Sequence, residues 1–262
     1  MLSIVIATCN DRIKHLDIPE KTDGVSYVVV HQVFDEGDEA SVGSNHFLYG
    51  EFNERCDVKV LTLYSKGLSK SRNFGLHSCG TKFVHIMDDD VDINVKEIKK
   101  MASWMDENHI DVATGLHAFK TKGISCNRKG IHEHNRVSLF GVSSIDICLN
   151  LSSVLRSGIE FDEEFGLGAR YPSGEEYVFL SDCYKANLKV FFFPACVGVH
   201  PDLTSGEDFY STKIRTVAKR KMIKRVFGNW AYFVIVAFWL KKIKVAWSKG
   251  YFFSFTKNIF FR

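Results

Sequence analysis

The chain has 262 residues, of which 45% are hydrophobic and 25% are charged. This length and composition fit one large α/β domain or two small ones and argue against a disordered chain. The seven cysteines are odd in number, widely spaced and without a Cys-x-x-Cys pair, which argues against a disulfide framework and a cysteine zinc site and favours a reducing compartment.

The net charge of +3 hides a division between two parts of the chain. Residues 213–262 contain 13 of the 34 Lys and Arg residues and no Asp or Glu, so the first 212 residues carry the other 21 against all 31 acidic residues. We therefore expect an acidic body, residues 1–212, and a separate basic tail, residues 213–262. The chain opens on a strand-like segment with no secretory signal, so we expect the body to lie in the cytoplasm.

Strands and helices are predicted to alternate along the body. The predicted strands are apolar and rich in β-branched residues, and they are 2–7, 27–30, 58–63, 83–87 and 190–199. Apolar residues recur at helical spacing over 65–78 and 95–108, and an acidic, glycine-punctuated loop is predicted over 35–43. This alternation predicts an α/β fold with a mostly parallel sheet and helices on both faces.

Three consecutive aspartates, Asp88, Asp89 and Asp90, follow the predicted strand 83–87. In an open parallel sheet, ligands bind where strands end. Carboxylates this close together repel one another unless a cation or several hydrogen-bond donors hold them ionised. Hard oxygen ligands suit Mg²⁺ or Mn²⁺, so the triplet indicates either a metal site or a solvated acidic turn.

A second pair of carboxylates, Glu175 and Glu176, lies at the predicted start of a helix after a glycine-rich segment. Two interpretations remain open. Ser173 and Glu176 have the spacing of a capping box, and acidic residues are favoured in a first helical turn, but the glycines would also permit close approach of a substrate. His200 ends the strand 190–199, where it is either structural or a further metal ligand.

Residues 115–145 are rich in Gly, Ser, Asn and His and show no clear period. Three histidines, His117, His132 and His134, lie in this region without the spacing of a metal site. We expect them to be exposed to solvent.

The tail combines basic residues with apolar and aromatic ones. Residues 226–240 are uncharged, and Lys241, Lys242 and Lys244 follow them. As a helix these residues would rise about 22 Å, short of a hydrocarbon core of roughly 30 Å, so we expect the tail to lie in the interface of an anionic membrane. The alternatives are a helix packed on the protein itself and RNA binding, which an apolar run does not serve.

Several segments in this order resemble family 2 glycosyltransferases with the GT-A fold, a Rossmann-like α/β fold, especially bacterial enzymes of capsule or lipopolysaccharide O-antigen assembly. They span roughly residues 1–205 and are SIVIATCNDR, GLSKSRNFG, DDDV, FDEEFGLGARYPSGEE and VGVHP. The resemblance implies a GT-A domain over residues 1–212, followed by the basic, apolar helical tail.

The resemblance also implies roles for individual residues. Glu176 would be the catalytic base, and Glu175 would orient it or the acceptor. Asp90, with Asp88 and His200, would hold Mn²⁺ or Mg²⁺. The residues implied to bind the nucleotide-sugar donor are Thr8, Asn10, Gln32, Arg72, Asn73, Asp88 and Asp89. The chain departs from the family in having His31 and Gln32 where an acidic pair is common, and Glu where the base is usually Asp.

The implied function is metal-dependent, inverting transfer of a sugar from a nucleotide sugar, most simply a UDP-sugar, to a hydroxyl of a saccharide or lipid-linked acceptor. The enzyme would be peripheral on the cytoplasmic face of the inner (plasma) membrane, in surface-polysaccharide synthesis, with no nucleic-acid partner. One alternative, a sugar nucleotidyltransferase, should open with a glycine-rich basic phosphate loop that TCNDR lacks. The other, a non-catalytic nucleotide-sugar-binding scaffold on the membrane, requires Glu175 and Glu176 to face away from the cleft.

Overall fold

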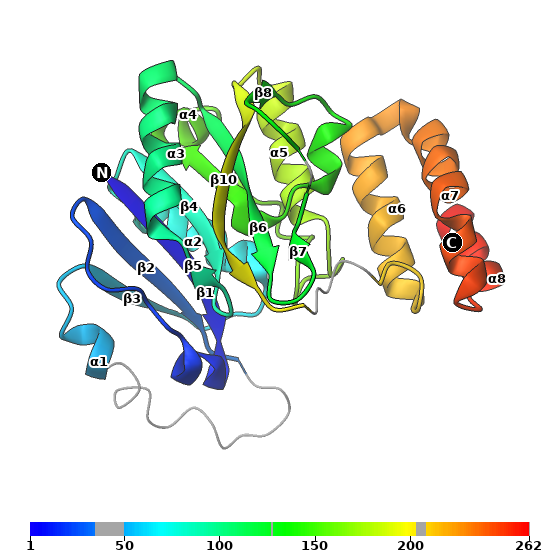
Figure 1. Ribbon diagram of the computed structural model, residues 1–262. Coiled ribbons are helices and arrows are strands. Elements are labelled where there is room, and N and C mark those ends of the chain that lie inside the picture. Colours follow the sequence, from blue (N-terminus) through cyan, green and yellow to red (C-terminus); the bar gives the residue numbers. More distant parts are fainter. Residues whose placement is uncertain (35–49, 127, 203–207, 262) are drawn as a thin grey trace.

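The computed structural model describes residues 1–34, 50–126, 128–202 and 208–261, so the predicted loop 35–43 lies outside the described residues. A large sheet with helices on both faces forms the body, and three helices of the tail stand at one side of it (Figure 1). The expected α/β fold is confirmed.

The central sheet is mostly parallel, as predicted, with short antiparallel strands added to it. Its strand order is β3-β2-β1-β4-β9-β6-β10-β5, with β7 beside β6 and β8 beside β10. The strands are β1 (Leu2–Cys9), β2 (Val25–Gln32), β3 (Val58–Leu63), β4 (Phe83–Asp88), β5 (Asp92–Ile93), β6 (Val112–Phe119), β7 (Gly123–Ile124), β8 (His132–Glu133), β9 (Ile147–Asn150) and β10 (Val190–His200). Strands β3, β2, β1 and β4 run parallel, as do β6 and β10, but β9 lies antiparallel between β4 and β6.

Helices cover the two faces of the sheet. The α-helices of the body are α1 (Gly50–Asn53), α2 (Leu68–Ser78), α3 (Val95–Asn108), α4 (Leu151–Arg156) and α5 (Glu175–Lys185), and short 3-10 turns occupy Asn10–His15, Ser138–Gly141 and Ser144–Asp146. Side chains alternate along each strand, so Val5 packs in the core shared with α2, α4 and α5, whereas Ile4 and Ile6 pack in the core shared with α3.

Helix α3 has the apolar face that its sequence predicts. Ile98, Met101, Ala102 and Met105 are all buried against the sheet. The side chain of Asn94 caps the helix start by accepting a hydrogen bond from the Glu97 backbone N–H. This helix stabilises the sheet face opposite α5.

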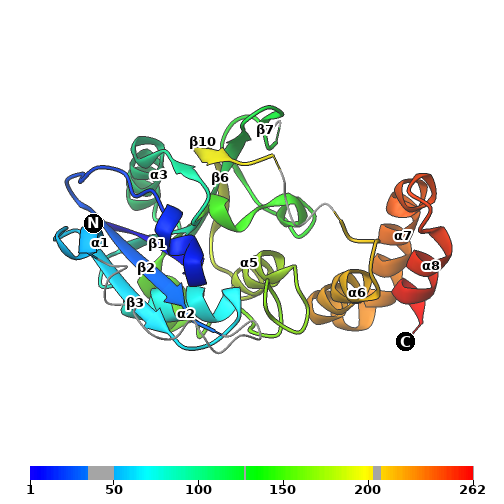
Figure 2. The same ribbon diagram turned by 90° about the horizontal axis from the view of Figure 1, so that it is seen from below.

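The tail forms three helices, α6 (Lys213–Phe227), α7 (Ala231–Ser248) and α8 (Phe252–Phe260). A turn at Gly228–Trp230 lets α7 fold back along α6 (Figure 1), so the predicted apolar run 226–240 crosses this turn instead of forming one helix. Figure 2 shows α6 beside α5, and Met222 and Val226 of α6 lie in the same core as α5. The tail therefore packs on the body through α6.

The tail also presents a large apolar surface to solvent. Over Lys213–Ser248 one 18-residue window has a mean hydropathy of 1.3 and is only 17% buried, so by length and composition one stretch of the described chain is apolar enough to cross a membrane. The turn at Gly228–Trp230 interrupts this stretch. The exposed aromatic side chains of the tail are Trp230, Tyr232, Phe233, Trp247, Tyr251, Phe253 and Phe261.

Candidate active-site cleft

Two adjoining cavities open at the carboxyl ends of β1, β2, β4 and β10, where an α/β sheet binds its ligands. The first cavity has a volume of about 410 Å³ and the second about 530 Å³. Leu68, Asp88, Leu167 and His200 line both of them. The two cavities therefore form one cleft with Asp88 and His200 at its junction.

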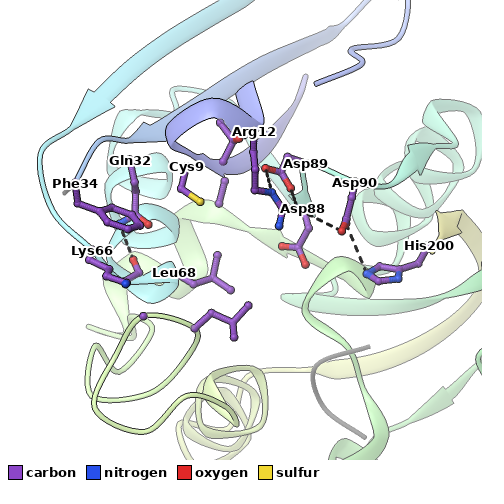
Figure 3. Close-up of a pocket in the computed structure, with 15 residues that line it drawn as sticks. Cys9, Arg12, Gln32, Phe34, Lys66, Leu68, Asp88, Asp89, Asp90 and His200 are labelled. Atoms are coloured by element: carbon purple, nitrogen blue, oxygen red, sulfur yellow. Dashed lines mark hydrogen bonds and ion pairs between the residues drawn. The ribbon is translucent and has the colours of Figure 1, made fainter. Parts of the chain in front are cut away.

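The first cavity offers polar groups for a ligand at the ends of β1 and β2 (Figure 3). The hydroxyl of Thr8 is buried and has no hydrogen-bond partner among the described residues. The Gln32 amide donates to the Gly67 carbonyl at 2.9 Å, which leaves its oxygen able to accept a hydrogen bond. Asn10 does not line the cavity, because its amide is bonded to the Phe34 backbone.

Two arginines contact the aspartate triplet. Asp88 accepts a hydrogen bond from Arg72 at 3.0 Å, and Asp89 accepts one from Arg12 Nε at 2.9 Å. Asp90 lies 3.3 Å from Arg12 Nη2 and 3.7 Å from His200 Nε2, as Figure 3 shows. The three carboxylates are therefore bound by cationic side chains and do not form a simple hydrated turn.

The residues predicted to hold a metal share one cavity of the cleft. Asp88, Asp90 and His200 all line the first cavity. Among the residues that the structure describes, however, no group of three His, Cys, Asp or Glu side chains forms a ready-made metal site. Mg²⁺ and Mn²⁺ commonly take one or two carboxylates and complete their shell with phosphate and water. These residues thus fit a metal that arrives with a diphosphate.

Arg72 links the aspartate triplet to the glutamate pair. Its fully buried guanidinium donates to Glu175 at 2.9 Å, to Asp88 at 3.0 Å and to the Ser144 hydroxyl at 2.8 Å. Burial acts to lower the pKa of Arg72, but the two carboxylates outweigh it and raise that pKa. Its neighbour Asn73 does not line either cavity, because its amide is bonded to the Phe161 backbone.

Glu175 and Glu176 both line the second cavity but differ in environment. Burial acts to raise the pKa of Glu175, and the charge of Arg72 outweighs it, so that pKa is lowered. Burial and the adjacent Glu175 carboxylate raise the pKa of Glu176. Helix α5 begins after Gly174 without a side-chain cap, so the capping box of Ser173 and Glu176 is not formed. Glu176 is thus the carboxylate with the greater affinity for a proton.

The glycine-rich loop before α5 is bonded to the start of α2, beside the first cavity. The Leu68 backbone N–H donates to the Leu167 carbonyl at 2.8 Å, and the Ser69 hydroxyl donates to the Phe165 carbonyl at 2.6 Å. Gly166 has a φ of +104°, and a Cβ there would lie 3.1 Å from the Ser69 hydroxyl. The loop can approach this closely because the position is glycine.

Several residues of the cleft were not predicted. Arg12 was not singled out, although it follows the first strand in TCNDR, and no sequence pattern links Lys219 or Lys242 to the second cavity that they line. The prediction that His117 and His134 are exposed is wrong. His117 is 3% exposed and contacts Asp146 at 3.0 Å, and His134 is 2% exposed and contacts Thr114 at 2.7 Å. Buried hydrogen-bond partners far along the chain hold both rings inside.

Comparison with known proteins identifies the same kind of fold. Residues 44–148 match the family model described as glycosyl transferase family 2. No curated protein sequence matches the chain. The structure of S. aureus TarS 1–349 in complex with UDP is similar, with a TM-score of 0.59 and 20% identity, covering 88% of this chain and 68% of that one. The same TarS segment with UDP-GlcNAc is 19% identical at the same TM-score and coverage.

A more distant structure extends this likeness. Mannosyltransferase PcManGT from Pyrobaculum calidifontis, in complex with GDP-Man and Mn²⁺, is 11% identical with a TM-score of 0.53, covering 86% of this chain and 62% of that one. At these identities the likeness is one of fold. The fold shared by these proteins is the GT-A fold.

Proposed function

We propose that the chain is a family 2 glycosyltransferase, an inverting enzyme that uses a UDP-sugar with Mn²⁺ or Mg²⁺. The match of residues 44–148 to the family 2 model and the GT-A fold of the chain support this proposal. The acceptor is a hydroxyl of a saccharide or lipid-linked saccharide in surface-polysaccharide synthesis. The observation that carries the proposal is Arg72, which bonds to Asp88 at the junction of the cavities and to Glu175 in the second cavity.

The first cavity suits the donor. TarS was solved with UDP and with UDP-GlcNAc, and PcManGT with GDP-Man and Mn²⁺. By analogy, Thr8 and Gln32 would bind the nucleoside, with Asp88 near the ribose. Arg12 and Asp89 would lie near the diphosphate.

A metal ion would be held by Asp90 and His200, with oxygen atoms of the diphosphate completing its shell. When bound, it would supply positive charge to the departing diphosphate. Asp90 lies next to Arg12, so the arginine would have to share the carboxylate with the ion.

The second cavity suits the acceptor. The acceptor oxygen would attack the anomeric carbon and form the new C–O bond as the bond from that carbon to the diphosphate oxygen breaks. The leaving diphosphate would keep the electron pair, and the hydroxyl proton would pass to Glu176. The raised pKa of Glu176 favours this proton transfer. Glu175, bonded to Arg72, would position its neighbour and the acceptor.

The tail supports action at a membrane. It carries 13 Lys and Arg residues and no acidic ones, together with exposed aromatic side chains. Anionic headgroups attract basic segments, and aromatic rings settle at the boundary with the acyl chains. We therefore assign the enzyme to the cytoplasmic face of the membrane, where a lipid-linked acceptor would be reached.

Thermal unfolding in the presence of nucleotides tests the donor and metal assignments. UDP should raise the melting temperature in the presence of Mn²⁺ and much less in EDTA, because a ligand that binds only the folded state stabilises it. A panel of nucleotide sugars measured in the same way would identify the donor.

Asp90→Ala should abolish both the Mn²⁺-dependent protection and sugar transfer. The matched control is Asp92→Ala, which removes a carboxylate two residues away that does not line the cleft. If Asp90→Ala kept the full Mn²⁺-dependent protection against thermal unfolding and a normal turnover, Asp90 would not be a metal ligand.

A further inference from the structure

Two lysines of the tail face the second cavity. Lys219 is on α6 and Lys242 on α7, and both line the cavity that Glu176 also lines. Each side chain is half-buried, unlike its exposed neighbours Lys221 and Lys241. The turn between α6 and α7 therefore brings together two cations that are far apart in the sequence.

Three carboxylates share the cavity wall with these two charges. Arg72 bonds to Asp88 and Glu175, and the charge of Lys219 acts on Glu176 from a distance, in the direction that lowers its pKa. Within the part of the chain that the structure describes, neither Lys219 nor Lys242 makes an ion pair within 4 Å.

The environment of Lys242 includes the charge of Lys219. Burial, followed by the charges of Lys241 and Lys219, lowers the pKa of Lys242. Two like charges in a partly desolvated wall are unfavourable unless an anion lies between them.

Apolar groups surround the lysines. Phe140, Phe209 and Val245 line the same cavity, and Lys242 Nζ lies 5.1 Å from the centre of the Phe209 ring. Low-dielectric walls strengthen the attraction between a cation and an anionic ligand. The site thus combines an electrostatic anchor with surface suited to the apolar or sugar part of the same molecule.

We propose that Lys219 and Lys242 form an anion-binding subsite, and that the acceptor carries a phosphate or diphosphate group that this subsite holds while Glu176 receives the hydroxyl proton. The proposal rests on the assignment of the second cavity to the acceptor. The phosphate could belong to a lipid-linked diphosphate or to a soluble phosphorylated saccharide, since both present the same group.

Binding of small diphosphates in EDTA tests the subsite apart from the donor site. Farnesyl diphosphate, inorganic pyrophosphate and uncharged farnesol would be titrated against the full chain by calorimetry. We expect both diphosphates to bind and farnesol not to bind. The variant Lys219→Met/Lys242→Met removes the two charges and keeps the aliphatic stems, and it should weaken diphosphate binding about tenfold or more, since charge-assisted hydrogen bonds are lost.

The matched control is Lys241→Met/Lys244→Met, which makes the same change at two exposed lysines of α7. It should bind both diphosphates as the parent chain does. Tighter binding of farnesyl diphosphate than of pyrophosphate would support a lipid-linked acceptor, and equal binding would support a soluble phosphorylated one. Diphosphate binding that is unchanged in Lys219→Met/Lys242→Met, or reduced equally in the control, would overturn the proposal.

The protection by UDP and Mn²⁺ distinguishes a failure of this inference from a failure of the proposed function. Lys219→Met/Lys242→Met should retain that protection, because neither lysine lines the first cavity. Retained protection with unchanged diphosphate binding would reject the subsite alone. A parent chain without UDP protection would reject the proposed donor instead.

Discussion

Two adjacent glutamates acquire different properties because one arginine contacts only one of them. Glu175 is 6% exposed and bonded to Arg72, so it stays ionised as part of a buried ion pair. Glu176 has no such cation in contact and lies beside the negative charge of Glu175, so its pKa is raised. A carboxylate with a raised pKa is a better proton acceptor for a hydroxyl than an ordinary one.

Glu176→Gln should lower the rate of sugar transfer by about 10² or more, the usual contribution of a general base, and leave donor binding nearly unchanged. The parent rate should rise with pH through the raised pKa of Glu176, because only the deprotonated carboxylate can accept the proton. The variant should lack this rise. Rates measured from acid to alkaline pH at saturating donor would show both effects.

Glu164→Gln is the matched control, since it makes the same change at an exposed glutamate of the preceding loop. It should keep both the rate and the pH dependence of the parent. A normal rate in Glu176→Gln would move the role of the base to Glu175 or elsewhere.

Sequence position predicted the reactive groups better than it predicted their partners. Asp88 ends a strand and Glu176 lies in the first turn of a helix, so local pattern was enough to select them as candidates. Asn10 and Asn73 were implied to bind the donor, but their side-chain amides are hydrogen-bonded to the backbone of distant segments. Which atoms an amide contacts depends on segments distant in sequence, as with Asn73 and Phe161, so the sequence could not reveal it.

Helix α5 starts where it does because α6 packs against Gly174, the residue just before the helix. Gly174 has a φ of +98°, and a Cβ at this position would lie 2.5 Å from the sulfur of Met222 in α6. The glycine permits both the backbone conformation and the close approach. The position of Glu175 and Glu176 therefore depends on the tail.

Gly174→Ala should lower the free energy of unfolding by about 2–5 kcal/mol, because a left-handed backbone costs about 1–2 kcal/mol and an overpacked contact about 1–3 kcal/mol. It should also reduce the transfer rate, since the helix start must shift. Denaturant unfolding and turnover would measure the two effects.

Gly158→Ala separates the backbone cost from the packing cost. Gly158 also has a positive φ, of +66°, but a Cβ there meets nothing within 4 Å, so about 1 kcal/mol is expected. Combining Gly174→Ala with Met222→Ala should cost less than the sum of the single changes. Additive costs would show that Met222 does not restrain the helix start.

Strands β6 and β9 were not predicted from the sequence, and the same reason explains both. Strand β6 contains Gly115 and His117, which interrupt an apolar pattern, and β9 has only four residues. Both are held by pairing with neighbours on either side in the sheet. Strands such as β1 and β2 have continuous apolar runs and were predicted directly.

The acidic body and the basic tail form one packed structure even though their compositions differ. Arg225 of α6 bonds to Asp162 at 3.0 Å and to Asp182 at 2.7 Å, and the apolar side of α6 joins the core of the body. Composition indicated two separate parts, because charge counts do not show which side of a helix is apolar. Removing residues 226–262 would take away buried side chains such as Ile235 and Phe255, so truncation is a poor test of membrane binding.

Surface substitutions at the two ends of α7 test whether the tail lies flat in a membrane interface. Trp230 and Phe233 are 70% and 66% exposed at one end, and Trp247 and Phe253 are 66% and 82% exposed near the other. A helix of this length is about 27 Å long, so an end-on contact would bring only one of its ends to the lipid. Trp230→Ser/Phe233→Ser and Trp247→Ser/Phe253→Ser should each weaken binding to phosphatidylglycerol vesicles about tenfold, through lost apolar burial.

Co-sedimentation with vesicles of phosphatidylglycerol and phosphatidylcholine would measure this binding. Tyr64→Ser is the control, because Tyr64 is 73% exposed on the body, away from the tail helices. It should bind as the parent does, and binding of the parent should fall as salt screens the basic residues of the tail. A loss confined to one end of α7 would mean that the helix meets the membrane end-on, and equal binding of all variants would mean that the aromatic surface serves another partner.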